Sequence, residues 1–216
     1  MVTQEGTIRI TATFSEDRKH RYALKRIWSD DDSLPMATCL MSNAPDTQDI
    51  TKGCLTSMLI QNQLAALGYR GCVLVNLFSY GCQKLDLSGD ISGLTDDTNT
   101  EQILQAVSET DVCVVAIGSL TKTYKKAAVF QNRLFALLRE RGFEGKVHTI
   151  AAPCGAEGLH PLSGKLREVG TWRIVPFALP QLPEPNTAAD PNDKAAASGK
   201  NKKKKQEPKI IPIANS

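Results

Sequence analysis

The sequence predicts an α/β fold: a three-layer sandwich with a central, mostly parallel sheet, an N-terminal β-hairpin and a disordered C-terminal tail. From residue 35 onward, short apolar runs alternate with amphipathic helical stretches. Strands that are apolar on both faces are typical of parallel sheets covered by helices on each side. Before residue 35, two alternating segments flank a polar stretch, which indicates a hairpin packed on a larger body.

The hairpin strands are expected at residues 6–14 and 20–28, with SEDRK as the turn between them. Four core strands and three helices should then follow in alternation. The expected strands are PMATCLMS, GCVLVNLFSY, DVCVVAIGS and KVHTIAAP, and the expected helices are TKGCLTSMLIQNQLAALG, TNTEQILQAVSET and KAAVFQNRLFALLRERG. Thr98 and Glu101 have the spacing of a capping box. Gly68 and Gly142 stand where helix ends favour a positive φ.

Length and composition predict one α/β domain at residues 1–180, with the hairpin within 1–30, the core at 35–175 and a Lys-rich tail at 181–216. Seven of the 26 Lys and Arg residues and four of the 23 Asp and Glu residues lie in the tail, so the remainder holds 19 of each sign. The KNKKKK run predicts salt-sensitive contacts with phosphates. The alternative is a solvated tail that only keeps the protein soluble.

Several classes of protein are excluded by the sequence. There is no apolar run of about 18 residues, and the start lacks the basic-then-apolar layout of a secretory signal, so we expect a cytoplasmic protein without a membrane segment. The six cysteines form no C-x-x-C pair and there are three histidines, which argues against a disulfide framework or a zinc site. We expect no metal and no cofactor. The oligomeric state is not predicted.

Candidate site residues follow the core strands, because ligands of open parallel sheets bind beyond the carboxyl ends of the strands. The first loop holds Ser42, Asn43, Asp46 and Asp49. A carboxylate here is suited to act as a general base or to stabilise a transition state. It is equally suited to form a turn, and Asp49 or the nearby threonine could begin the next helix. Asn76, near the end of the second core strand, would lie on the same rim.

The loop after the fourth core strand contains His160, which could serve as a base, an acid or a neutral hydrogen-bond donor. Two other interpretations apply to this loop. Cys154 and His160 could form a nucleophile and its base, although no third orienting group is evident. The glycines at 155, 158 and 164 could cradle a phosphate, but their spacing matches neither the P-loop nor the dinucleotide fingerprint.

These segments resemble an uncharacterised prokaryotic family catalogued as domain of unknown function 1643. Its pattern has an Arg-Tyr start with a downstream Trp, a strand ending Asn-Pro-Ser, a Gly-Tyr before a strand ending Asn-Leu-Phe, a Trp-Gly after the third strand and a late His-Pro-Leu. The matching positions are Arg21, Tyr22, Trp28, Asn43, Pro45, Asn76, Leu77, Phe78, Gly118, His160, Pro161 and Leu162. Ala44, Gly81 and Ile117 depart from the pattern, which implies an altered substrate or weakened activity.

The order of the motifs is also similar to that of the uracil-DNA glycosylase superfamily, whose members hydrolyse N-glycosidic bonds on a parallel-sheet α/β fold. This resemblance implies that Asn43 or Asp46 positions the attacking water, that Asn76 recognises the edge of the base and that His160 donates to the base oxygen. The same motifs contain three further residues that we assign to substrate binding, Ser42, Phe78 and Ser163.

The sequence therefore favours a glycosylase-like hydrolase that acts on a nucleobase in nucleic acid or nucleotides. A non-catalytic binding module for nucleic acid or nucleotide on the same fold is the main alternative. A third alternative is that Asn76 and His160 are buried structural groups, in which case replacing them would mainly lower thermal stability.

Overall fold

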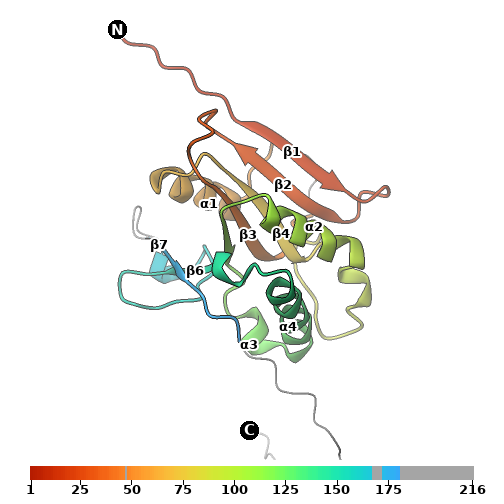
Figure 1. Ribbon diagram of the computed structural model, residues 1–216. Helices are drawn as coiled ribbons and strands as arrows, with labels where there is room; N and C mark the ends of the chain where they lie inside the picture. The colour runs from red at the N-terminus through yellow and green to blue at the C-terminus, as the bar shows by residue number, and fades with distance from the viewer. Residues whose placement is uncertain (47, 167–171, 181–216) are drawn as a thin grey trace, which may run out of the picture. The chain divides into compact units, whose positions relative to one another are not determined.

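The strands of the protein form one seven-stranded sheet, seen in a computed structural model that describes residues 1–46, 48–166 and 172–180 (Figure 1). Along the sheet the order is β1-β2-β4-β3-β5-β6-β7. The strands span Arg9–Phe14 (β1), Arg21–Ile27 (β2), Met36–Asn43 (β3), Gly71–Phe78 (β4), Val112–Val115 (β5), Val147–Ala151 (β6) and Arg173–Pro176 (β7). The expected mixed α/β class is confirmed.

The sheet is parallel only in its centre. β4, β3, β5 and β6 pair in parallel, whereas β1 with β2, β2 with β4, and β6 with β7 pair antiparallel. The expectation of a mostly parallel sheet therefore holds for the four central strands and not for the two margins. The N-terminal hairpin is present as β1 and β2, and it extends the sheet beyond β4.

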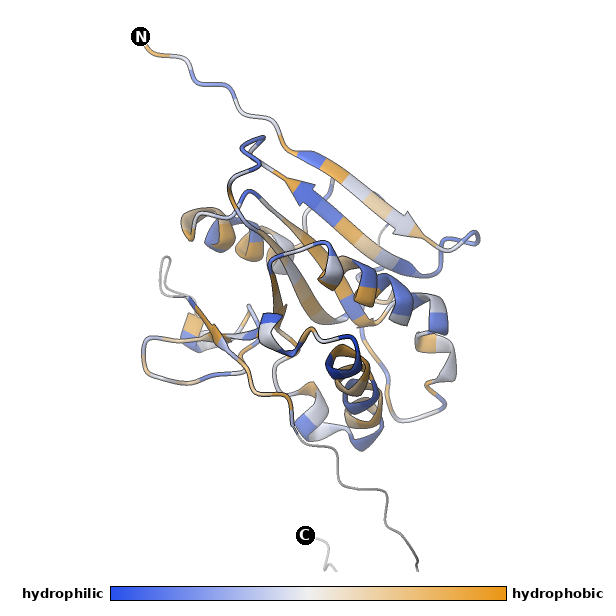
Figure 2. Ribbon diagram, viewed as in Figure 1, coloured by the Kyte–Doolittle hydropathy of each residue, from blue (hydrophilic) through white to orange (hydrophobic). Residues whose placement is uncertain are grey.

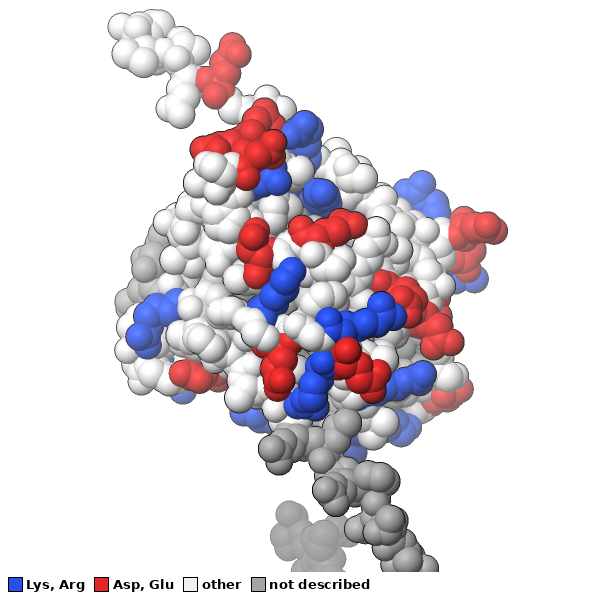
Figure 3. Space-filling view, viewed as in Figure 1, with Lys and Arg blue, Asp and Glu red and all other residues white. Residues whose placement is uncertain are grey.

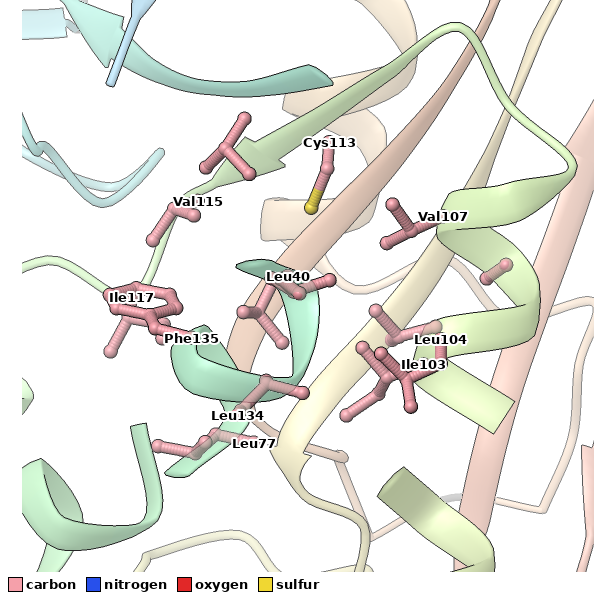
Figure 4. Close-up of a cluster of buried hydrophobic side chains, with 14 of the residues drawn as sticks. Leu40, Leu77, Ile103, Leu104, Val107, Cys113, Val115, Ile117, Leu134 and Phe135 are labelled. Atoms are coloured by element: carbon pink, nitrogen blue, oxygen red, sulfur yellow. The ribbon is translucent and has the colours of Figure 1, made fainter. Parts of the chain in front are cut away.

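Buried apolar residues form two clusters on opposite faces of the sheet, because successive strand residues point to opposite sides. The α2/α4 cluster joins Val73, Val75 and other strand residues to helices α2 (Asp97–Ser108) and α4 (Lys125–Glu140). Figure 4 shows its centre, where side chains from both helices meet those of β3, β4 and β5. The α1 cluster packs Cys72 and Leu74 against helix α1 (Leu55–Ala66). Helices thus contact both faces, one face through a single long helix.

The hydrophobic colour in Figure 2 is concentrated on the central strands and on the inner side of α4, while β1 is mixed. This distribution fits the burial pattern, since all eight residues of β4 are buried and the residues of β1 are exposed or intermediate. A strand buried on both faces has a continuous apolar sequence rather than an alternating one. The polar exception within β4 is Asn76.

Two predicted helix starts are wrong. Helix α1 begins at Leu55 with Cys54 as its N-cap, because Asp49 instead accepts hydrogen bonds from the Thr51 backbone and hydroxyl and closes a local turn. Helix α2 begins at Asp97, and its cap is Asp96, whose carboxylate accepts from the Asn99 N–H at 2.7 Å. The capping box at Thr98 and Glu101 is therefore not formed.

The predicted helix ends are confirmed, since Gly68 and Gly142 have φ angles of +85° and +72°. The one-turn helix α3 (Leu120–Thr123) and strand β7 were not expected. No helix in the described ranges has the length and apolarity needed to cross a membrane. The six cysteines are free thiols. By its backbone contacts the chain divides into Met1–Leu182 and Pro183–Ser216. The predicted tail lies outside the described residues.

Candidate functional site

A cavity of about 510 Å³ opens at the carboxyl ends of β3 and β4, on the face that α1 covers. Cavities of this size accommodate small organic ligands. Five of the predicted site residues line it, namely Ser42, Asn43, Asp46, Asn76 and His160. We call it the Asn76 cavity. The prediction that the loops after the first, second and fourth core strands meet at one rim is consistent with this lining.

Asn76 contributes a buried amide to the cavity. Its side chain is 2% exposed, and its Nδ2 is buried without a hydrogen-bond partner. Such an orphaned donor costs about 1–3 kcal/mol, because the amide loses its water without gaining another partner. Met41, the parallel partner of Asn76 on β3, lines the same cavity. The amide therefore offers a donor and an acceptor in one plane to a bound ligand.

Asn99 of α2 holds the end of β4 in place. It is 1% exposed, and its Nδ2 donates to the backbone oxygen of Asn76 at 2.9 Å and to that of Leu77 at 3.4 Å. These bonds occupy the backbone of Asn76 and leave its side chain uncommitted. Asn99 is therefore a positioning residue, which the sequence analysis did not identify because an asparagine within a helix carries no distinctive spacing.

Asn43 is oriented by its neighbours. Its Nδ2 donates to the backbone oxygens of Ala44 at 3.1 Å and of Cys82 at 3.3 Å, and its Oδ1 accepts from the Ser42 hydroxyl at 3.3 Å. Because the amide hydrogens face backbone carbonyls, the oxygen is the atom that remains for a water or ligand. Asp46 supplies a carboxylate and is exposed at the mouth of the cavity. No other lining residue that the structure describes is acidic.

His160 is half-buried, and its hydrogen bond indicates its tautomer. The Leu162 backbone N–H donates to Nδ1 at 3.1 Å, which places the proton of the neutral ring on Nε2. Burial also lowers the pKa of His160 from its usual 6.5, so the ring is neutral at neutral pH. His160 is thus suited to donate a hydrogen bond through Nε2 rather than to carry a positive charge.

Gly118 allows the His160 loop to approach β5. This glycine follows the strand with a φ of +71°, and an added Cβ would lie 2.8 Å from the Cβ of His160. No side chain fits at that distance. The glycine in the VVAIG segment is therefore required both for its backbone conformation and for the position of the histidine.

Two residues assigned to substrate binding lie elsewhere. Phe78 is fully buried in the α2/α4 cluster, with its ring 5.7 Å from that of Phe130, so it does not reach the cavity and we withdraw its assignment. Ser163 lines an adjoining hollow of about 430 Å³, which shares His160 with the Asn76 cavity. Cys154 is exposed and lines neither space, which removes the geometric basis for a Cys154–His160 pair.

The cavity also has a basic part, which the sequence did not predict. Arg21 and Lys52 both line it, together with the N-cap Cys54 and with Thr56 and Ser57 from the first turn of α1. In the sequence Arg21 is recognisable only as part of a family motif, because an arginine at the start of a strand normally points to solvent. Within the described ranges, no cluster of three or more His, Cys, Asp or Glu residues is arranged to hold a metal.

The fold and the cavity define an α/β protein with a small-molecule-sized site at the carboxyl edge of its parallel strands. The chain belongs to the family described as protein of unknown function, DUF1643, whose profile matches residues 21–162. Comparison with curated proteins and comparison with solved structures both give no match. The comparisons thus support the family and give no support to the glycosylase resemblance.

Proposed function

We propose that the protein is a glycosylase-like hydrolase of N-glycosidic bonds that acts on a nucleobase in nucleic acid or nucleotides. The observation that carries this proposal is the unsatisfied amide of Asn76 in a cavity that also holds His160. A nucleobase edge presents adjacent donors and acceptors, which a planar amide matches. Rotation of the amide about χ2 would turn Nδ2 toward the cavity, where a bound base would supply the partner that Nδ2 lacks.

The reaction assigns a role to each group. Asp46 accepts a proton from water, whose oxygen attacks the anomeric carbon as the bond to the base nitrogen breaks. The Oδ1 of Asn43 orients this water from the same rim. His160 donates through Nε2 to the oxygen of the departing base, which carries the electron pair of the broken bond. The base anion then takes up the proton that Asp46 received, so the products are a free base and a sugar hydroxyl, and the step consumes one water.

A non-catalytic binding module is the second candidate, and the position of Asp46 favours it. The groups suited to recognition, Asn76 and His160, are buried or half-buried, whereas Asp46, the one acidic residue among the described residues of the cavity lining, is exposed. An exposed carboxylate is hydrated by bulk water, so nothing holds one attacking water against it. In this case the cavity would bind the base without cleaving its sugar bond.

The test is a mass-spectrometric search for bases released from cellular DNA, RNA and nucleotide pools. We expect the wild type to release one base, and Asp46→Asn and His160→Ala to release at least about 100-fold less, the usual contribution of a general acid or base. The matched control is His148→Ala, because His148 lies on β6 and lines neither space. It should release base at the wild-type rate.

The two candidates give different results. If no pool yields a free base but a nucleotide protects the wild type against thermal unfolding, the hydrolase proposal is rejected and the binding module stands. If His148→Ala loses as much activity as His160→Ala, the loss in His160→Ala comes from a general effect on the structure and not from a missing hydrogen-bond donor.

A further inference from the structure

Arg21 is a buried cation without a counterion. Its side chain belongs to a residue that is 7% exposed, and its Nε is buried without a hydrogen-bond partner. No ion pair joins Arg21 to any described residue. A buried guanidinium that lacks a partner is unfavourable, because it loses its water without compensation. Such a group indicates that an anion binds to it.

A β-bulge directs Arg21 toward the cavity. Thr13 of β1 pairs with Ala23, but the next residue, Phe14, pairs with Arg21. Tyr22 is therefore an extra residue on β2. Regular alternation would place Arg21 on the side of Ala23, which packs against the α2/α4 cluster. Instead Tyr22 takes that side, with its hydroxyl donating to Asp96 at 2.9 Å, and Arg21 lines the Asn76 cavity. Bulges commonly re-aim a side chain in this way beside a site.

The start of helix α1 adds positive potential to the same cavity. This 12-residue helix has no side-chain hydrogen bond at its N-cap, Cys54, and no acidic residue in its first turn. Free backbone N–H groups at a helix start bind anions. Thr56 and Ser57 of the first turn line the cavity, as does Lys52 before it. Arg21 supports an anion site independently of the helix start, because it is a buried, unpaired cation that lines the same cavity.

We propose that Arg21, Lys52 and the first turn of α1 form a subsite for the phosphate monoester of a nucleotide, whose base lies against Asn76. The base assignment rests on the proposed function. The planar guanidinium donates two parallel hydrogen bonds to a phosphate. A terminal monoester, unlike an internal diester, can reach a buried arginine without threading a polymer through the cavity. The ligand class is therefore a mononucleotide rather than a duplex.

The experiment compares the affinity of inorganic phosphate and of nucleoside 5′-monophosphates for the full-length wild type and for Arg21→Met. Binding is followed by calorimetry and by the rise in Tm at constant ionic strength, with chloride as the reference salt. We expect both ligands to raise the Tm of the wild type, and Arg21→Met to lose at least about tenfold in affinity. Without ligand, Arg21→Met should melt at the wild-type temperature or above it, because the uncompensated charge is gone.

Arg70→Met is the matched control. Arg70 also has a buried Nε without a hydrogen-bond partner, but its guanidinium is paired with Asp32 and it does not line the cavity. This variant should keep its response to phosphate. Arg21→Lys keeps the charge and loses the planar guanidinium, so it should bind severalfold more weakly while remaining folded.

Three results would overturn the subsite. The wild type could fail to respond to either ligand, Arg21→Met could respond as strongly as the wild type, or nucleosides could bind as tightly as their monophosphates. Tighter, Arg21-dependent binding of an oligonucleotide would instead assign the subsite to a diester. Phosphate binding without release of any base would reject the hydrolase and leave the subsite standing, so the two proposals fail separately.

Discussion

At the scale of single residues, the side-chain amide of Asn76 has a buried donor without a partner. We therefore predict that Asn76 can be replaced by an apolar residue without lowering the thermal stability of the protein. Leucine has the same branched shape as asparagine, its larger end can extend into the adjoining cavity, and it removes a buried donor whose orphaned state costs about 1–3 kcal/mol. We therefore expect Asn76→Leu to melt at or above the wild-type Tm and to lose ligand binding. Thermal unfolding and nucleotide titration measure the two effects.

Asn99 is the control for this substitution, because it is equally buried but makes hydrogen bonds to the backbone of β4. Asn99→Leu should cost about 1–3 kcal/mol by leaving those carbonyls without a donor. A lower Tm for Asn76→Leu than for Asn99→Leu would show that Asn76 is a structural residue, the third alternative in the sequence analysis.

His160 predicts a defined pH dependence. Burial lowers its pKa below 6.5, so the unfolded chain binds a proton at a higher pH than the folded protein does. The contribution of neutral His160 to stability is therefore complete above pH 6.5 and decreases as the pH falls toward the folded-state pKa. Base release should also be constant above pH 6.5 and decline only at the lower pKa of the folded protein, because protonation would place a hydrogen on Nδ1 against the Leu162 N–H.

The His160→Gln variant tests this assignment, since its amide can donate from a similar position and does not titrate. It should retain part of the activity and lose the decline of activity at acid pH. A decline that persists unchanged in His160→Gln would assign the titrating group to another residue.

The face of the sheet to which each side chain points was the feature of the site that the sequence predicted least well. Period-two alternation places Asn76 and Phe78 on one face of β4, yet two consecutive residues, Leu77 and Phe78, both join the α2/α4 cluster. The alternation breaks at the strand end, where a helix side chain takes up the backbone carbonyls. The orientation of Arg21 depends on a bulge that no local sequence pattern announces.

At the scale of elements, the loop that carries His160 packs closely against Gly118 in the turn after β5. Gly118→Ala places a Cβ 2.8 Å from that of His160, so we expect the loop to shift and ligand affinity to fall at least tenfold, by about 1.4 kcal/mol. The positive φ adds a conformational cost of about 1–2 kcal/mol to folding. Nucleotide titration and thermal unfolding separate these effects.

Gly142→Ala is the matched control, because Gly142 has a φ of +72° but no atom within 4 Å of an added Cβ. It should lose about the same stability and keep its ligand affinity. If both alanine variants bind alike, the position of His160 does not depend on its contact with Gly118.

The elements themselves were predictable where a long pattern specifies them. Buried strands and amphipathic helices occur where apolar runs and helical periodicity place them, because these patterns extend over many residues. Helix starts depend on one or two hydrogen bonds, and Asp96 competes for the role expected of Thr98. β7 has four residues and ends in proline, which is too short a pattern to predict a strand.

At the scale of the whole molecule, the charge distribution favours a small ligand over a nucleic-acid polymer. The chain outside the tail carries 19 basic and 19 acidic residues, and the face seen in Figure 3 has both signs interspersed. A duplex-binding groove requires a continuous basic surface, which this face does not present. In the cavity, by contrast, Arg21 is buried, which suits a single phosphate.

Substitution of the lysines at 202–205 tests whether the mononucleotide and a nucleic-acid polymer depend on different basic residues. Replacing all four with glutamine, in Lys202→Gln, Lys203→Gln, Lys204→Gln and Lys205→Gln together, should leave the affinity for a nucleoside monophosphate unchanged, because that ligand depends on Arg21. The affinity for a single-stranded oligonucleotide should become less salt-dependent, with a slope of log K against log salt smaller by up to about 3. Fluorescence titrations at several salt concentrations measure both. An unchanged slope would mean that the run makes no contact with phosphates, whereas weaker monophosphate binding would contradict the dependence of that ligand on Arg21.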